Sequence, residues 1–124
     1  MPTNIEIFHA HDFIKATPHG TFDLEMSKQM LREIASAAKP WLHFEIILDT
    51  RVMQSDMSRF DLWHLAEELG KLRAGFFHKM AVLCPIERFD HAGFFALCAE
   101  NRGFQVRAFT SYEDTMEWLM AKET

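Results

Sequence analysis

The chain has 124 residues and a mass of 14.5 kDa, which is the size of one ordinary domain. Hydrophobic residues make up 48% and charged residues 25%, a composition that can bury a core and excludes a disordered tail. The net charge is −5, and the 13 basic residues are scattered along the sequence. Because phosphate binding needs a concentrated cationic face, nucleic acid is not an expected partner.

The first residues show no basic segment followed by an unbroken apolar run, so we expect no signal peptide. No window approaches the roughly 18 uncharged apolar residues of a membrane span. Cys84 and Cys98 lie within apolar stretches, which indicates reduced core thiols. Together these features predict a cytoplasmic protein.

The first third of the chain predicts a hairpin, a helix and a buried strand. Residues 5–9 and 13–17 alternate apolar and polar side chains, which is typical of two antiparallel strands. Apolar residues then recur at helical spacing over 22–38, with Thr21 or Asp23 as candidate caps. Residues 44–48 form a nearly continuous apolar run, which indicates a strand covered on both faces.

The remaining sequence alternates helices and strands after an irregular polar segment at 49–58. A helix from about Met57 or Ser58 to Leu72 begins with a Ser58–Asp61 capping box. Further elements are expected as strands at 80–84 and 105–109 and helices at 90–101 and 111–121. The order ββαβαβαβα predicts one α/β domain over 1–124, with a mixed, mostly parallel sheet and helices on both faces.

The loops after parallel strands meet at one edge of the sheet, where ligands collect. The polar residues and thiol expected there are Asp49, Thr50, Arg51, Cys84, Thr110 and Ser111. A phosphoacceptor carboxylate at Asp49 is not favoured, because no acidic pair follows the first strand and no lysine follows the last. Cys84 as a nucleophile would need His78 or His91 as its base, whereas a thiol that ends a buried strand is usually inert. No catalytic set is therefore predicted.

Seven histidines raise the question of a metal site, and His9, His11 and Asp12 are close in sequence. Three ligands in a tight hairpin rarely enclose a metal without a fourth group, and no His-x-x-x-His or Cys-x-x-Cys spacing is present. Glycine-rich phosphate loops are absent from the sequence as well. We expect neither a metal nor a cofactor.

The segment Ser55-Asp56-Met57-Ser58 leads directly into a predicted helix. Asp56 and Ser58 are the residue types that cap helices, which is their simplest role. The free N–H groups of a helix N-terminus also stabilise a phosphate. Phosphorylation of Ser58 or Ser55 is the alternative interpretation.

A second feature of this region is its surplus of apolar side chains. Phe60 and Trp63 lie apart from the leucines that form the other apolar face of the predicted helix, and Met53 and Met57 precede them. These four residues and Asp56 predict an apolar surface for a second copy, a regulator or a hydrophobic ligand. The alternative is that a thin domain simply covers itself with aromatic side chains.

Several segments resemble the STAS/SpoIIAA-like family, and the resemblance covers nearly the whole chain. They are residues 46–49, 56–58, 80–83 and the closing stretch 109–119, with its acidic helix start and Trp118-Leu119 pair. The resemblance implies an α/β domain related in architecture to CRAL-TRIO lipid-transfer domains. Anti-sigma antagonists of this family carry an Asp-Ser-Ser-Gly-like turn with a phosphorylated serine, to which Asp56 and Ser58 correspond; its first serine and its glycine have no counterpart here.

The resemblance and the apolar segment together favour a non-enzymatic regulatory module that binds a protein partner or a second copy of itself. A small carrier of an apolar molecule or lipid is the alternative, and an enzyme that uses the strand edge is the third hypothesis. The partner surface is expected at Met53, Asp56, Met57, Phe60 and Trp63.

Overall fold

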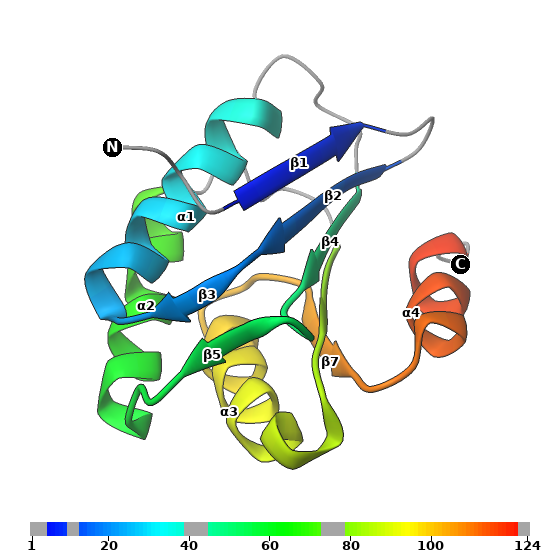
Figure 1. The fold of residues 1–124 in the computed structure, drawn as a ribbon. Helices are drawn as coiled ribbons and strands as arrows, with labels where there is room; N and C mark the ends of the chain where they lie inside the picture. Colours follow the sequence, from blue (N-terminus) through cyan, green and yellow to red (C-terminus); the bar gives the residue numbers. More distant parts are fainter. Residues whose placement is uncertain (1–4, 10–12, 39–44, 73–78, 122–124) are drawn as a thin grey trace.

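The computed structural model describes residues 5–9, 13–38, 45–72 and 79–121. A five-stranded sheet forms the centre, in the order β1-β2-β4-β6-β7 (Figure 1). Its strands are β1 (Ile5–His9), β2 (Phe13–Pro18), β4 (Glu45–Asp49), β6 (Met80–Leu83) and β7 (Val106–Phe109). β1 pairs with β2 in antiparallel register and all other neighbours are parallel, which confirms the predicted mixed, mostly parallel sheet.

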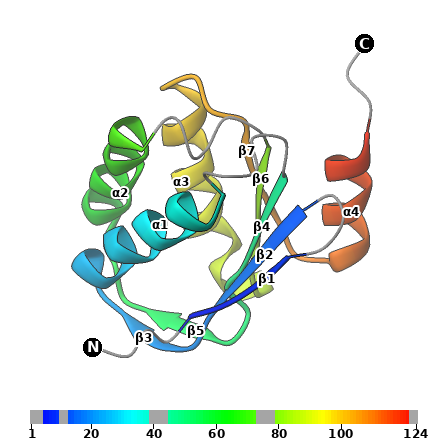
Figure 2. The ribbon, with the colours of Figure 1, turned by 90° about the horizontal axis from the view of Figure 1, so that it is seen from above.

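The helices are distributed unequally over the two faces of the sheet. They are α1 (Leu24–Ala38), α2 (Arg59–Lys71), α3 (Phe89–Glu100), which follows the 3-10 turn η2 (Ile86–Arg88), and α4 (Tyr112–Met120). Figure 2 shows α1, α2 and α3 on one face and α4 on the other. From β2 onward the parallel strands follow the chain without reversal, so successive right-handed crossovers place their three helices on the same side. Within the described ranges, α4, which follows the last strand, is the one helix that covers the second face.

Alternate residues of the central strands serve two hydrophobic cores. Ile46 and Leu48 of β4 contribute to the large core under α1, α2 and α3. Ile47, between them, joins the small core with Ala81 and Leu119 on the side of α4. This two-sided burial is the physical reason for the continuous apolar run in the sequence.

The structure differs from the sequence prediction in a second, two-stranded sheet. β3 (Gly20–Phe22) pairs in parallel with β5 (Met53–Ser55). β5 lies inside segment 49–58, which was expected to be irregular. Gly20 adopts φ 89°, a left-handed conformation that suits glycine and redirects the chain after β2. Three-residue strands with one buried residue each carry too little alternation to be recognised in the sequence.

Helix starts agree with the local sequence chemistry. Asp23 accepts a hydrogen bond from the N–H of Met26 (2.8 Å) at the start of α1, which therefore begins two residues after the predicted Phe22. Ser58 and Asp61 form the predicted capping box of α2. Among the described residues, no helix is long and apolar enough to cross a bilayer.

Candidate functional site

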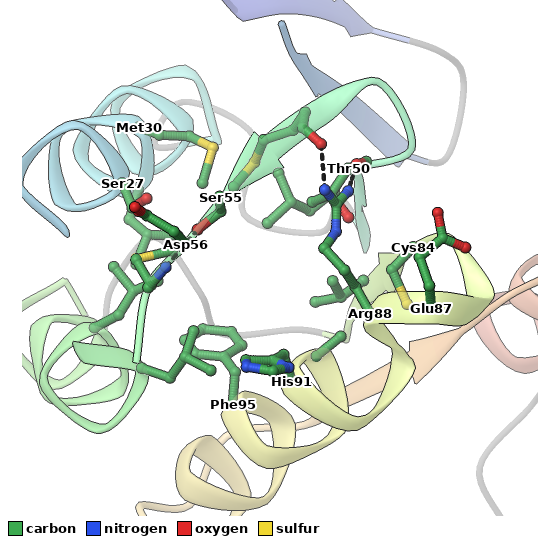
Figure 3. Close-up of a pocket in the computed structure, with 18 residues that line it drawn as sticks. Ser27, Met30, Thr50, Ser55, Asp56, Cys84, Glu87, Arg88, His91 and Phe95 are labelled. Atoms are coloured by element: carbon green, nitrogen blue, oxygen red, sulfur yellow. Dashed lines mark hydrogen bonds between the residues drawn. The ribbon is translucent and has the colours of Figure 1, made fainter. Parts of the chain in front are cut away.

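A cavity of about 220 Å³ lies at the carboxyl ends of β4 and β6, beneath the three helices of the large core. Its walls come from α1, the β4–β5 segment, the start of α2, and the η2–α3 region (Figure 3). Most of the lining is apolar, including the buried side chains of Met30, Met53, Met57 and Phe95. Asp56, Glu87 and His91 also line it and are exposed to solvent, so the cavity opens between the start of α2 and the start of α3.

Ser27 stands out among the residues of the wall. Its side chain is 0% exposed, and its hydroxyl oxygen has no hydrogen-bond partner among the described residues. The neighbouring helical bond from its own N–H to the carbonyl oxygen of Asp23 (2.9 Å) is intact, so the backbone there is regular. A buried hydroxyl without a partner costs free energy, and native proteins contain few of them.

Arg88 lies on the side of the cavity opposite Ser27 (Figure 3). Its guanidinium donates hydrogen bonds to the backbone carbonyl oxygens of Thr50 and Met53. One side chain from η2 therefore holds both the loop after β4 and the strand β5. Both carbonyl groups belong to buried residues, where a charged donor is worth more than at the surface.

Cys84 lines the same cavity but lacks the features of a nucleophile. Burial raises the pKa of its thiol, and the nearby charge of Arg88 offsets this only in part. The Cys84 sulfur contacts the carbonyl oxygen of Phe109 at 3.4 Å. A thiol with a raised pKa is protonated near neutral pH and is a poor nucleophile. His78, one of its two candidate bases, lies outside the described residues.

The carboxylate of Asp49, at the end of β4, is paired with two neighbouring cations. Asp49 accepts two side-chain hydrogen bonds from Arg51, at 3.0 and 2.9 Å, and its carboxylate lies 3.6 Å from the ammonium nitrogen of Lys15. Burial alone would raise the pKa of Asp49, but the hydrogen bonds from Arg51, with the charges of Arg51 and Lys15, outweigh it and lower the pKa. The carboxylate is thus held in its charged form by two cations.

The Asp49→Asn variant is expected to be less stable than the native protein by about 1–3 kcal/mol at pH 7, because the amide removes the negative charge and replaces one of the two acceptor oxygens facing Arg51 with a donor. The folded pKa lies below the usual 3.8, so this stabilisation is complete above 3.8 and disappears as the pH falls through the folded pKa. Urea unfolding of both proteins from pH 7 down to about pH 2 measures it. A difference in the free energy of unfolding that stays constant over that pH range would contradict the stabilising role of the charged Asp49 carboxylate.

The predicted partner surface is divided between the interior and the outside. Met53 and Met57 are buried in the cavity wall, whereas Phe60 is 69% and Trp63 40% exposed on α2. The His64 ring makes an edge contact with each of the two rings, with centroids 4.5 Å from Phe60 and 5.1 Å from Trp63. We call Phe60, Trp63 and His64 the outer aromatic face. The opposite side of α2 is in the core through Leu62, Leu65 and Leu69.

The two candidate phosphoacceptor serines differ in access. Ser58 is exposed, and its hydroxyl accepts the N–H of Asp61 at 3.1 Å. Ser55 is half-buried, lines the cavity, and accepts the N–H of Met57 at 3.2 Å. Asp56, between them, is exposed and is not the cap of α2; Ser58 has that role.

The metal hypothesis concerned residues that the structure leaves largely undescribed. His11 and Asp12 lie outside the described residues, and for His9 only the backbone is described, as part of β1. Within the described ranges, no group of three His, Cys, Asp or Glu side chains could hold a metal ion.

Comparison with known proteins gives a fold. No family model matches the sequence, and no curated protein does either. Among solved structures, the chain is similar to an uncharacterised DUF3478-family protein from Shewanella loihica PV-4, described as having a SpoIIAA-like fold. The TM-score is 0.57 and the identity 19%, over 93% of this chain and 91% of that one. This chain has a SpoIIAA-like fold. It is also similar to the anti-sigma factor antagonist SpoIIAA in its unphosphorylated form (TM-score 0.56, 12% identity, 95% of this chain and 99% of that one).

Within this SpoIIAA-like fold, sequence reasoning missed Ser27 and Arg88. Ser27 is one serine on an amphipathic helix, and only its position among Met30, Leu31 and the facing segments makes it buried. Arg88 follows Pro85 in an unremarkable surface-like stretch. A weak signal for Ser27 was available, because it lies three residues before the buried Met30 and four before Leu31, which places all three on one helix face.

Proposed function

We propose that the protein is a non-enzymatic regulatory module that binds a partner protein through the outer aromatic face of α2. The observation that carries this proposal is the exposure of Phe60 (69%) and Trp63 (40%) one helical turn apart. The core side of the same helix is already occupied by leucines, so folding does not require these two rings. Aromatic side chains held on a rigid helix are common anchors of protein interfaces.

The surroundings of this face favour a partner with apolar and acidic groups. The Arg102 guanidinium stacks on the Trp63 ring at 4.8 Å, and that of Arg59 lies 5.1 Å from the centre of the Phe94 ring. Arg102 therefore borders the exposed Trp63 ring, and Arg59 directly precedes Phe60 in α2. A partner that inserts an apolar side chain beside Phe60 can place a carboxylate near one of them.

Ser58 is the phosphoacceptor that fits this proposal, because it is exposed and immediately precedes the outer aromatic face. A phosphate at this position would add negative charge beside Asp56 and Asp61 and within one helical turn of Phe60. Phosphorylation would then weaken the binding of a partner whose carboxylates approach Arg59. Ser55, which faces the cavity wall, is less accessible to a kinase.

Site-specific photocrosslinking in the native cells tests the proposal. A photoreactive phenylalanine in place of Phe60 is expected to give one discrete crosslinked product, and additional Trp63→Ser substitution should reduce it severalfold. The same group at Met120, which is 59% exposed on α4, is the matched control and should give no such product. A product of twice the 14.5 kDa mass identifies the partner as a second copy.

Equal crosslinking from positions 60 and 120, or none from position 60, would contradict the proposed function. Mass spectrometry of the same native samples addresses Ser58. A serine that remains unmodified under several growth conditions would count against phosphorylation and leave the binding result unaffected.

A further inference from the structure

We propose that the cavity beneath α1, α2 and α3 is a binding site for a small, uncharged aromatic molecule that carries one hydrogen-bonding group, which Ser27 recognises. The site is independent of the outer aromatic face, because its walls face the interior of the large core while Phe60 and Trp63 face solvent. The inference rests on the size of the cavity, the chemistry of its walls and the state of the Ser27 hydroxyl.

The volume of about 220 Å³ restricts the size of the molecule. An engineered apolar cavity of about 150 Å³ binds benzene, so this cavity has room for a larger ring system. Pockets for drug-sized ligands span roughly 300–1,000 Å³, which is more than is present here. A bicyclic aromatic compound fits within this volume, whereas the long acyl chains of a lipid would extend through the opening into solvent.

The walls favour an aromatic ring over an alkyl chain. Met30, Met53 and Met57 present polarisable thioethers that form favourable sulfur–aromatic contacts, and Phe95 can offer a ring for edge or offset stacking. These four side chains are buried, and they come from α1, the β5–α2 segment and α3. Figure 3 shows Met30 and Phe95 on different sides of the space. Methionine side chains also adapt their shape to a ligand at little cost.

The Ser27 hydroxyl supplies the polar contact. It is fully buried at the wall and lacks a hydrogen-bond partner among the described residues. Because this oxygen has almost no surface open to the cavity, the adaptable methionine side chains of the wall must move aside before a ligand N–H or O–H can reach it. The contact then removes the desolvation cost of the unpaired group. On the opposite side, the guanidinium of Arg88 already donates hydrogen bonds to the carbonyl oxygens of Thr50 and Met53. Because backbone groups satisfy it, its presence does not favour an anionic ligand.

Binding of indole and of indene, in which a CH₂ replaces the N–H, tests the proposal on the full chain. With ¹³C-methyl methionine labelling, indole is expected to shift the resonances of Met30, Met53 and Met57 in a saturable manner. Indene should bind more weakly than indole. Ser27→Ala is expected to weaken indole binding about 3- to 10-fold and to leave indene binding within about 2-fold, because only indole donates to the hydroxyl.

Filling the cavity gives a second, independent variant. Ala92 lines the cavity from α3, and Ala92→Phe is expected to abolish the binding of both compounds while the unaffected methionine resonances show that the fold persists. Binding that survives in Ala92→Phe would place the compounds elsewhere and overturn the proposal. A Ser27→Ala substitution that changes the affinity for both compounds equally, or for neither, would also overturn it. So would tighter binding of octanoate than of indole, or the absence of a saturable shift at millimolar indole.

Discussion

The Arg88→Met variant is expected to lose about 2–4 kcal/mol of the free energy of unfolding. The substitution keeps an unbranched apolar stem but removes the guanidinium that donates to the carbonyl oxygens of Thr50 and Met53. Both carbonyl oxygens belong to buried residues. Water can therefore donate to them in place of the guanidinium only if the β4–β5 segment moves outward. The destabilisation should therefore be accompanied by local opening of the β4–β5 segment.

Urea unfolding and amide hydrogen exchange measure the two parts of this prediction. Exchange should accelerate in residues 50–57 more than in β6, because Arg88 contacts the former through its side chain. Arg107→Met is the matched control, since Arg107 is exposed and lies over the Trp118 ring on the other side of the sheet. Its stability should change by no more than about 0.5 kcal/mol. Equal stability of Arg88→Met and the native protein would show that the two hydrogen bonds are unimportant.

The second large effect is expected for Lys79→Met, again about 2–4 kcal/mol. The buried ammonium of Lys79 donates to the carbonyl oxygens of Trp118 (2.9 Å) and Ala121 (3.1 Å) at the C-terminal end of α4, and it lies 5.3 Å from the centre of the Trp118 ring. The Trp118 carbonyl also accepts the N–H of Ala121 (3.3 Å), and the Lys79 ammonium adds a charged donor there that complements the helix dipole. Without it, α4 loses its main polar attachment to the sheet.

Detachment of α4 would expose the small core around Ile47 and Ala81. Hydrogen exchange should therefore accelerate throughout residues 112–121, while α1 to α3 keep their protection. Lys71→Met is the control, because Lys71 is exposed at the end of α2, where it forms a 3.8 Å ion pair with Glu68. Unchanged protection of α4 in Lys79→Met would mean that apolar contacts alone hold the helix.

The parts of the fold that could be predicted are those with a strong local signal. The capping box of Ser58 and Asp61 lies within four consecutive residues, and its two hydrogen bonds form as the sequence indicates. The apolar runs at 44–48 and 80–84 predicted strands buried on both sides, and Ile47 and Ala81 do face the second core. Gly103, with φ 91°, follows α3 where the sequence placed the end of that helix.

The candidate sites were predicted less completely, because each depends on which neighbour covers a residue. Phe60 and Trp63 were separated from the leucine face of α2 by helical spacing alone, and both are exposed. Met53 and Met57 were assigned to the same surface because they are close in sequence. They lie inside instead, since the pairing of β5 with β3 carries this segment against α1 and over the cavity.

Length, composition and local pattern by themselves determined that this protein is a single α/β unit with a buried, mostly parallel sheet and a capped helix that carries two apolar faces. Only the tertiary structure decided which methionines are internal, that Ser27 is buried without a partner among the described residues, and that Arg88 and Lys79 each hold two carbonyl groups distant in sequence. The physical reason is that helix and strand periodicities act over a few residues, whereas burial and hydrogen-bond pairing here join groups more than 30 residues apart.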